Sequence, residues 1–162
     1  EKTIHKESIY KGAIIDLEVH DVELPDGNTS KRELVYHNGA VAVCPVTPDN
    51  KVILVKQFRK PAEKPLLEIP AGKLEKGEER LSAAKRELEE ETGYIAEDLE
   101  LITEMYGSPG FSNEKISIYM ANSLKVGEMH LDDDEFIELV YYDVDDIKDM
   151  LKNNSPNQVR II

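Results

Sequence analysis

The chain has 162 residues, of which 40% are hydrophobic and 33% charged, and its formal net charge is −13 at pH 7. This length and composition predict one soluble globular protein with a sizeable core, and the apolar runs are too short to span a bilayer. The negative charge argues against nucleic acid as a partner, because phosphate backbones select basic surfaces. We therefore expect neither a nucleic-acid nor a membrane partner.

The single cysteine, Cys44, lies in the apolar run 40–46. One cysteine allows no internal disulfide, which favours a reducing cytosol and predicts a cytoplasmic protein. We interpret Cys44 as a buried small hydrophobic residue in a strand rather than as a nucleophile. The four histidines are scattered and match no zinc-binding spacing.

Three short strands are predicted in the N-terminal segment from alternating or β-branched apolar positions: 7–10, 14–24 and 31–37. Residues 25–28, Pro-Asp-Gly-Asn, are a strong turn signal, so the last two strands are expected to form a hairpin. An antiparallel piece of this size has little core of its own and must pack on the rest of the chain or on a second copy. We therefore predict an N-terminal segment over 1–38 and a second domain over 39–162.

The second domain carries denser strand signals and two helical patterns. Strands are predicted over 41–47, 52–58, 66–69, 99–106, 116–122 and 139–143, and helices over 78–92 and 145–153. Strands mixed with two helices in this order predict an α/β sandwich.

The helix predicted over 78–92 contains no Pro or Gly, and Leu81, Ala84 and Leu88 make a narrow apolar stripe along it. Glu87 and Glu91 are four residues apart and share one face. Like charges at this spacing destabilise a helix by roughly 0.2–0.5 kcal/mol per pair, so a cation that neutralises them is favoured. Magnesium takes oxygen ligands of this kind. A solvated acidic face is the alternative interpretation.

The residues around this helix follow the pattern G-x5-E-x7-R-E-L-x-E-E-x-G from Gly72 to Gly93. The pattern resembles the signature box of the Nudix hydrolases at every fixed position. The resemblance implies a Nudix α/β/α sandwich with a mixed central sheet, here preceded by an N-terminal antiparallel β-sheet segment. It also implies hydrolysis of a diphosphate bond with Mg2+, or Mn2+, as the cofactor. Arg86 is expected to hold Glu90 one turn further on.

Features outside the box resemble the ADP-ribose pyrophosphatase subgroup. Pro109 lies 16 residues past Gly93, within a run 108–114 that looks like the substrate loop of the subgroup, and the run 55–72 looks like its approach to the box. The resemblance implies metal ligands, substrate contacts and a homodimer whose N-terminal strands exchange between subunits. The implied metal ligands are Glu87, Glu91, the Ala71 carbonyl and Glu90, and the implied substrate-binding residues are Arg32, Arg59, Glu68, Pro109, Gly110 and Glu114.

An acidic run over 132–135 precedes the last predicted strand. By itself it reads as a solvated loop. In the subgroup a loop at this place supplies the general base and another metal ligand. Glu135 is the best-placed residue for both roles, Asp133 is the alternative base, and Glu90 and Arg86 complete the expected catalytic set.

The function expected from the resemblance is the hydrolysis of ADP-ribose to AMP and ribose 5-phosphate. One alternative keeps the chemistry and changes the substrate to another nucleoside diphosphate sugar, such as GDP-mannose or ADP-glucose. A non-catalytic Nudix-like ligand sensor is the alternative from another class. Such a sensor would be expected to lose box carboxylates, whereas this chain keeps Glu87, Glu90 and Glu91.

Overall fold

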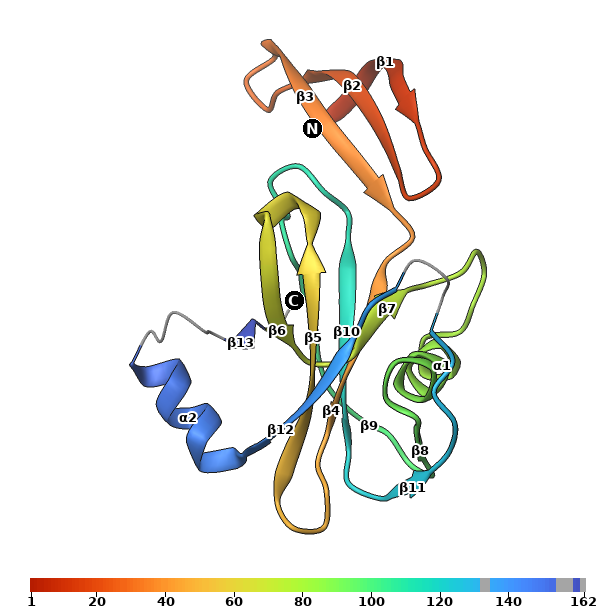
Figure 1. Cartoon of the computed structure of the whole chain (residues 1–162). Coiled ribbons are helices and arrows are strands. Elements are labelled where there is room, and N and C mark those ends of the chain that lie inside the picture. The colour runs from red at the N-terminus through yellow and green to blue at the C-terminus, as the bar shows by residue number, and fades with distance from the viewer. Residues whose placement is uncertain (132–134, 154–158, 161–162) are drawn as a thin grey trace. The chain divides into compact units, whose positions relative to one another are not determined.

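The computed structural model describes residues 1–131, 135–153 and 159–160, and Figure 1 follows them from the N-terminus to the C-terminus. The chain forms two compact units. The first contains Glu1–Gly39 and Glu104–Ile116, and the second contains Ala40–Thr103 and Ser117–Ile162. The predicted exchange of N-terminal strands between subunits stays a prediction.

The first unit is built on an antiparallel sheet of β1 (Lys2–Lys11), β2 (Ile15–Glu23) and β3 (Thr29–His37), in that order. The hairpin predicted between the last two strands is present, and Gly27 in its turn has the left-handed φ of 85° that glycine tolerates. β1 starts at Lys2 rather than at the predicted residue 7. All its residues are exposed, and the strand is defined by its backbone pairing with β2. No alternation of buried apolar residues therefore marks its start in the sequence.

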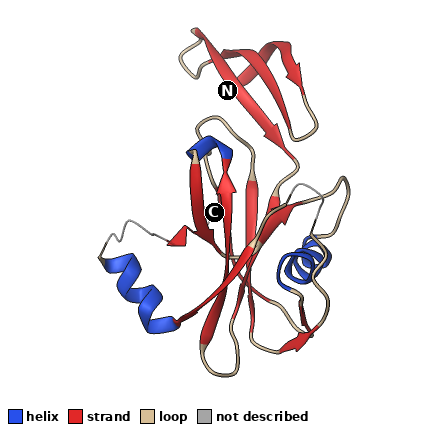
Figure 2. Ribbon diagram, in the orientation of Figure 1, coloured by secondary structure: helices blue, strands red, loops and turns tan. Residues whose placement is uncertain are grey.

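The second unit contains most of the strands and both of the α-helices that the structure describes, and Figure 2 colours strands red and helices blue. The predicted α/β class is confirmed. One sheet has the order β7-β4-β10-β9, a second has the order β12-β5-β6-β13, and β11 pairs with β8. The elements are β4 (Ala40–Pro45), β5 (Lys51–Arg59), η1 (Lys60–Ala62), β6 (Lys64–Glu68), β7 (Ala71–Lys73), α1 (Arg80–Thr92), β8 (Tyr94–Ala96), β9 (Glu100–Tyr106), β10 (Lys115–Ala121), β11 (Leu124–Val126), β12 (Glu138–Asp143), α2 (Val144–Lys152) and β13 (Val159–Arg160).

The sheet that contains β5 is mixed, because β13 runs parallel to β6 while β5 is antiparallel to both β6 and β12. The C-terminal end of β9, the N-terminal end of β10 and the loop that joins them belong to the first unit. Among the described residues, no helix is both long and apolar enough to cross a membrane.

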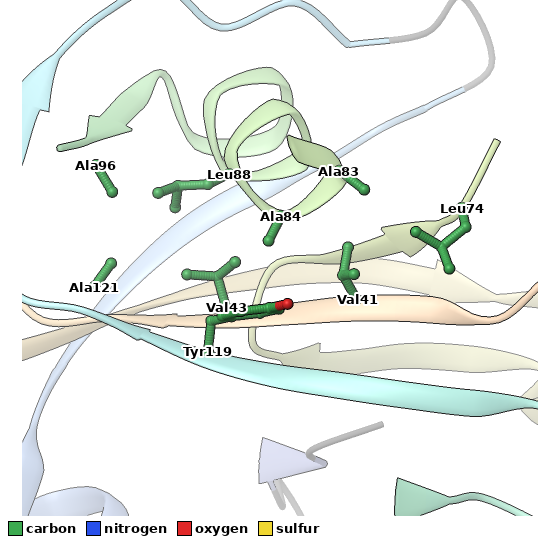
Figure 3. Close-up of a cluster of buried hydrophobic side chains, with 9 residues drawn as sticks. All are labelled: Val41, Val43, Leu74, Ala83, Ala84, Leu88, Ala96, Tyr119 and Ala121. Atoms are coloured by element: carbon green, nitrogen blue, oxygen red, sulfur yellow. The ribbon is translucent and has the colours of Figure 1, made fainter. Parts of the chain in front are cut away.

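A hydrophobic cluster lies between α1 and the β4–β10 strands, and Figure 3 shows its side chains converging. Small residues of α1 let the helix approach the sheet closely, and Leu88 fills the remaining space. The predicted apolar stripe was wrong at Leu81, which is exposed, because the buried face is centred on Ala84 and Leu88 and continues to Glu91 and Thr92. The cluster comprises Val41, Val43, Leu74, Ala83, Ala84, Leu88, Ala96, Tyr119 and Ala121.

Candidate active site

The candidate site begins with the way α1 is set against β7. The helix starts at Arg80, two residues later than predicted, because the Glu79 side chain accepts the Ser82 N–H (3.0 Å) and caps it. The helix ends at Gly93, whose φ of 70° is left-handed and whose N–H donates to the Glu89 carbonyl (2.8 Å). Both ends of the helix are therefore fixed by local hydrogen bonds.

Two carboxylates of α1 lie against the β7 backbone. Glu91 is only 3% exposed, and one of its oxygens accepts the Ala71 N–H at 2.9 Å. A Cβ added at Gly72 would lie 1.9 Å from Cδ of Glu87. Only glycine at position 72 therefore lets the Glu87 carboxylate approach this strand so closely.

Arg86 donates four hydrogen bonds to three carboxylates, one of which is Glu87. Its Nε and Nη2 donate to the two oxygens of Glu78 at 2.9 and 3.0 Å, and its Nη1 donates to Glu87 and Glu90, both at 2.8 Å. These contacts include the predicted Arg86–Glu90 pair. The Glu78 hydrogen bonds contribute most to raising the pKa of Arg86 above its usual value. Arg86 thus supplies a positive charge that balances the carboxylates of Glu78, Glu87 and Glu90.

The electrostatics of Glu87 and Glu91 are dominated by burial. Burial raises the pKa of Glu91 to about 8, while the Ala71 N–H and the Arg59 charge oppose the shift. Burial also raises the pKa of Glu87, against the opposing charge of Arg86. A buried carboxylate with a raised pKa lacks compensating positive charge. The pair therefore fits a hard divalent cation, which would supply that charge.

Glu135 belongs to the same electrostatic group, because its negative charge contributes to raising the pKa of both Glu87 and Glu91. Two residues that precede it in the chain, Gly127 and His130, are hydrogen-bonded to the end of α1. The Gly127 N–H donates to the Gly93 carbonyl at 2.7 Å, and the His130 N–H donates to the Glu90 carbonyl at 3.0 Å. Asp133, the other expected base, lies outside the described residues.

Within the described ranges 1–131, 135–153 and 159–160, no three carboxylate, imidazole or thiol groups form a ready-made metal site. Hydrogen bonds within the chain hold three carboxylates of α1. Arg86 holds Glu87 and Glu90, while the Ala71 N–H holds Glu91. The ligand set predicted from the sequence therefore stays a prediction.

Arg59 and Glu68 form a bidentate ion pair across β5 and β6. The Arg59 Nε lies 3.1 and 3.0 Å from the two oxygens of Glu68, and Nη2 lies 2.6 Å from one of them. Glu68 is 1% exposed, whereas the Arg59 side chain is 34% exposed. The buried Glu68 carboxylate therefore orients the guanidinium group of Arg59, and part of the Arg59 side chain remains accessible to solvent.

The remaining predicted substrate residues belong to the first unit. Arg32 in β3 pairs with Glu1 at 2.6 Å and donates to Ser30 Oγ at 2.9 Å. Pro109, Gly110 and Glu114 lie on the loop between β9 and β10. Their roles in substrate binding stay predictions.

Sequence reasoning left Glu78 out of the site residues, although it makes the bidentate contact with Arg86. Its signal was available, because Glu78 is a fixed position of the box pattern. The role of Gly72 in admitting Glu87 was also missed. Gly72 is likewise a fixed position of the box, but the pattern does not show which side chain lies against it.

Comparisons with known proteins cover both parts of the chain. The NUDIX domain model matches residues 36–162, and the model described as "Nucleoside diphosphate sugar hydrolase N-terminal domain" matches residues 1–35. An ADP-ribose pyrophosphatase of Bacillus subtilis (strain 168) is 57% identical over 148 residues, which are 90% of this chain and 80% of that protein.

Two further relatives extend the comparison. A methanol dehydrogenase activator of Bacillus methanolicus is 51% identical, over 94% of this chain and 83% of that protein. A crystal structure of an ADP compounds hydrolase superposes with a TM-score of 0.85 at 25% identity, covering 97% of this chain and 85% of the other. With the box residues gathered as described above, the chain belongs to the Nudix family and is a hydrolase of that family.

Proposed function

We propose that this hydrolase cleaves the diphosphate of ADP-ribose to give AMP and ribose 5-phosphate. The observation that carries the proposal is the pair of the buried Glu91 and the half-buried Glu87, held against β7 in a chain that is 57% identical to an ADP-ribose pyrophosphatase. Water attacks one phosphorus, one P–O bond of the diphosphate bridge breaks, and a proton is released.

The proposed cofactor is Mg2+, with Mn2+ as the alternative. Nudix hydrolases generally need a divalent metal ion. Glu87 and Glu91 would hold it, and the Ala71 carbonyl, Glu90 and Glu135 are further candidate ligands. When bound, such an ion neutralises charge on phosphoryl oxygens and makes water more acidic.

The side chains of the site have separate proposed roles. Arg59, oriented by Glu68, presents its guanidinium to the diphosphate, where arginine can form two parallel hydrogen bonds. Glu135 accepts the proton of the attacking water, a role for which a carboxylate must lie within hydrogen-bond reach of that water. Arg86 keeps Glu87 and Glu90 in place while charge changes around them.

The remaining substrate contacts are proposed for the first unit. Arg32 would contact the diphosphate or adenine side, and Glu114 would bind the terminal ribose. Pro109 and Gly110 would shape the loop that carries Glu114. We also propose a cytoplasmic homodimer in which the β1–β3 sheet, whose first strand is exposed throughout, packs on a second copy. A light-scattering mass equal to one chain would contradict the dimer.

The experiment that tests the function is hydrolysis of a substrate panel with magnesium at a pH near 8 and with the products resolved. ADP-ribose, GDP-mannose and ADP-glucose separate the proposed substrate from its alternatives. AMP and ribose 5-phosphate formed from ADP-ribose far faster than from the others would support the proposal. Preference for another sugar nucleotide would replace the substrate and keep the chemistry, and no turnover at all would favour a ligand sensor.

A second candidate function is activation of a methanol dehydrogenase. The 51% identity over 94% of the chain to a methanol dehydrogenase activator favours it. The test is the rate of methanol oxidation by that dehydrogenase with and without this protein, beside a Glu91→Gln variant. Activation by the wild type and not by the variant would tie the effect to hydrolysis, and no activation by either would exclude the second function.

A further inference from the structure

The loop between β9 and β10 is paired to the edge of the N-terminal sheet. The Val35 N–H of β3 donates to the Phe111 carbonyl at 2.8 Å, and the Asn113 N–H donates to the Val35 carbonyl at 3.2 Å. These two bonds form a parallel bridge between Val35 and Ser112. Because β3 is the outer strand of the order β1-β2-β3, its edge is a template for an added strand.

The side chain of Asn113 makes the next contact along this edge. In a regular parallel ladder, the following donor on β3, the His37 N–H, would bond to the main-chain carbonyl of residue 113. Here Oδ1 of Asn113 accepts it instead, at 2.7 Å. Asparagine side chains often replace backbone groups in this way. The main-chain pairing therefore ends at Asn113, and the chain turns into β10 at Lys115.

Glu114 directly follows this contact. Its N–H donates to Ser112 Oγ at 3.1 Å, and its Oε1 lies 3.6 Å from Nδ1 of His37. The Gly39 N–H donates to that same nitrogen at 3.0 Å. The backbone contacts around Asn113 and the approach of Glu114 to the His37 ring together set the place of Glu114.

We propose that Asn113 is a positioning residue for substrate recognition. By accepting the His37 N–H it sets the register of the 108–114 loop on β3, and with it the place of Glu114. The inference rests on the proposed function, in which Glu114 binds the terminal ribose of a nucleoside diphosphate sugar. Ribose hydroxyls donate hydrogen bonds that a carboxylate accepts, so an error in register would weaken this contact.

Two substitutions separate the hydrogen bond from the rest of the side chain. Asn113→Ala removes the acceptor, whereas Asn113→Asp keeps an oxygen that can receive the His37 N–H. With ADP-ribose and magnesium, we expect Asn113→Ala to raise KM about fivefold with little change in kcat, because one hydrogen bond contributes ~1 kcal/mol. In Asn113→Asp, by contrast, KM should stay close to the wild-type value. The matched control is Asn38→Ala, at an exposed position one residue past His37, which keeps the wild-type KM.

A double substitution tests whether Asn113 acts through Glu114. If it does, adding Asn113→Ala to Glu114→Gln changes KM little further, because the two changes remove the same interaction. Amide hydrogen exchange gives a readout besides activity. The His37 amide exchanges faster in Asn113→Ala than in the wild type, and Asn113→Asp restores its protection.

Several outcomes would overturn the inference: an unchanged KM in Asn113→Ala, an equally defective Asn113→Asp, or effects of the Asn113 and Glu114 substitutions that simply add. A wild-type protein that hydrolyses no nucleoside diphosphate sugar would instead overturn the proposed function. In that case unchanged exchange of the His37 amide in Asn113→Ala would still overturn the assigned register.

Discussion

In the N-terminal sheet, β1 exposes all ten of its residues, whereas in the second unit α1 buries Ala83, Ala84 and Leu88 completely. The sheet is held by its backbone ladder and by exposed ion pairs such as Lys31–Asp21, and exposed pairs of this kind contribute little to stability. The helix is held by close packing, which fixes side chains in single positions. The difference indicates that the close-packed unit is the better scaffold for chemistry that needs precise carboxylate placement.

The largest effect on turnover is expected at Glu91, the buried carboxylate of the close-packed helix α1. Glu91→Gln should lower kcat on the order of 1,000-fold, because it removes a carboxylate proposed to hold the metal ion. Its thermal midpoint should not fall, since the amide replaces a buried carboxyl group whose charged form is disfavoured by burial. The matched control is Glu89→Gln in the same helix, whose carboxylate lies beside Gly127. Near-normal turnover in Glu91→Gln would remove Glu91 from the site.

The comparison of packing is tested directly by one truncation in each region. Leu88→Ala should lower the free energy of unfolding by about 2–5 kcal/mol, because it leaves a cavity under α1. Ile9→Ala on β1 should lower it by less than about 0.5 kcal/mol, since Ile9 is exposed. Denaturant titration measures both. An equal loss at Ile9 would mean that the N-terminal sheet packs on another surface in solution.

A smaller effect is expected at Glu68, which orients Arg59, the arginine proposed to contact the diphosphate. Glu68→Gln should raise KM for ADP-ribose about tenfold, because hydrogen bonds between charged groups contribute ~1.5–3 kcal/mol and Arg59 loses part of its orientation. Combined with Arg59→Lys, the change should add little if Glu68 acts through Arg59. Full additivity in steady-state kinetics would show that Glu68 has a separate role.

The smallest effect is expected at the ion pairs of the N-terminal sheet. Lys31→Ala removes the 2.8 Å contact with Asp21, but both side chains face solvent. The thermal midpoint should stay unchanged within error, and so should kcat. A clear drop in the midpoint, measured by circular dichroism, would show that this sheet depends on its charges more than its exposure indicates.

Sequence patterns predicted the elements that have long, regular signals. The helix containing Glu87 and Glu91 and the 25–28 turn were both predictable, because composition and turn chemistry act locally. Strands β7, β8 and β11 were not, since three-residue strands show no periodicity.

The site was predictable as a set of residue types and not as an arrangement. The burial of Glu91, on a helix face whose other buried residues are uncharged, contradicts the rule that charged residues face water. The burial of Glu68 behind Arg59 depends on pairing between β5 and β6, which lies beyond any local pattern. Such contacts between segments that are distant in sequence exist only in the folded chain.

Arg86 has a consequence for how the protein behaves without its ion. Because its guanidinium already binds Glu78, Glu87 and Glu90, the carboxylates do not need a metal ion to remain close together. Chelation should therefore abolish turnover and leave the folded chain intact, unlike zinc fingers, whose folding requires the metal. Removal of the ion should also be reversible, so that adding a divalent ion after chelation restores turnover without refolding of the chain.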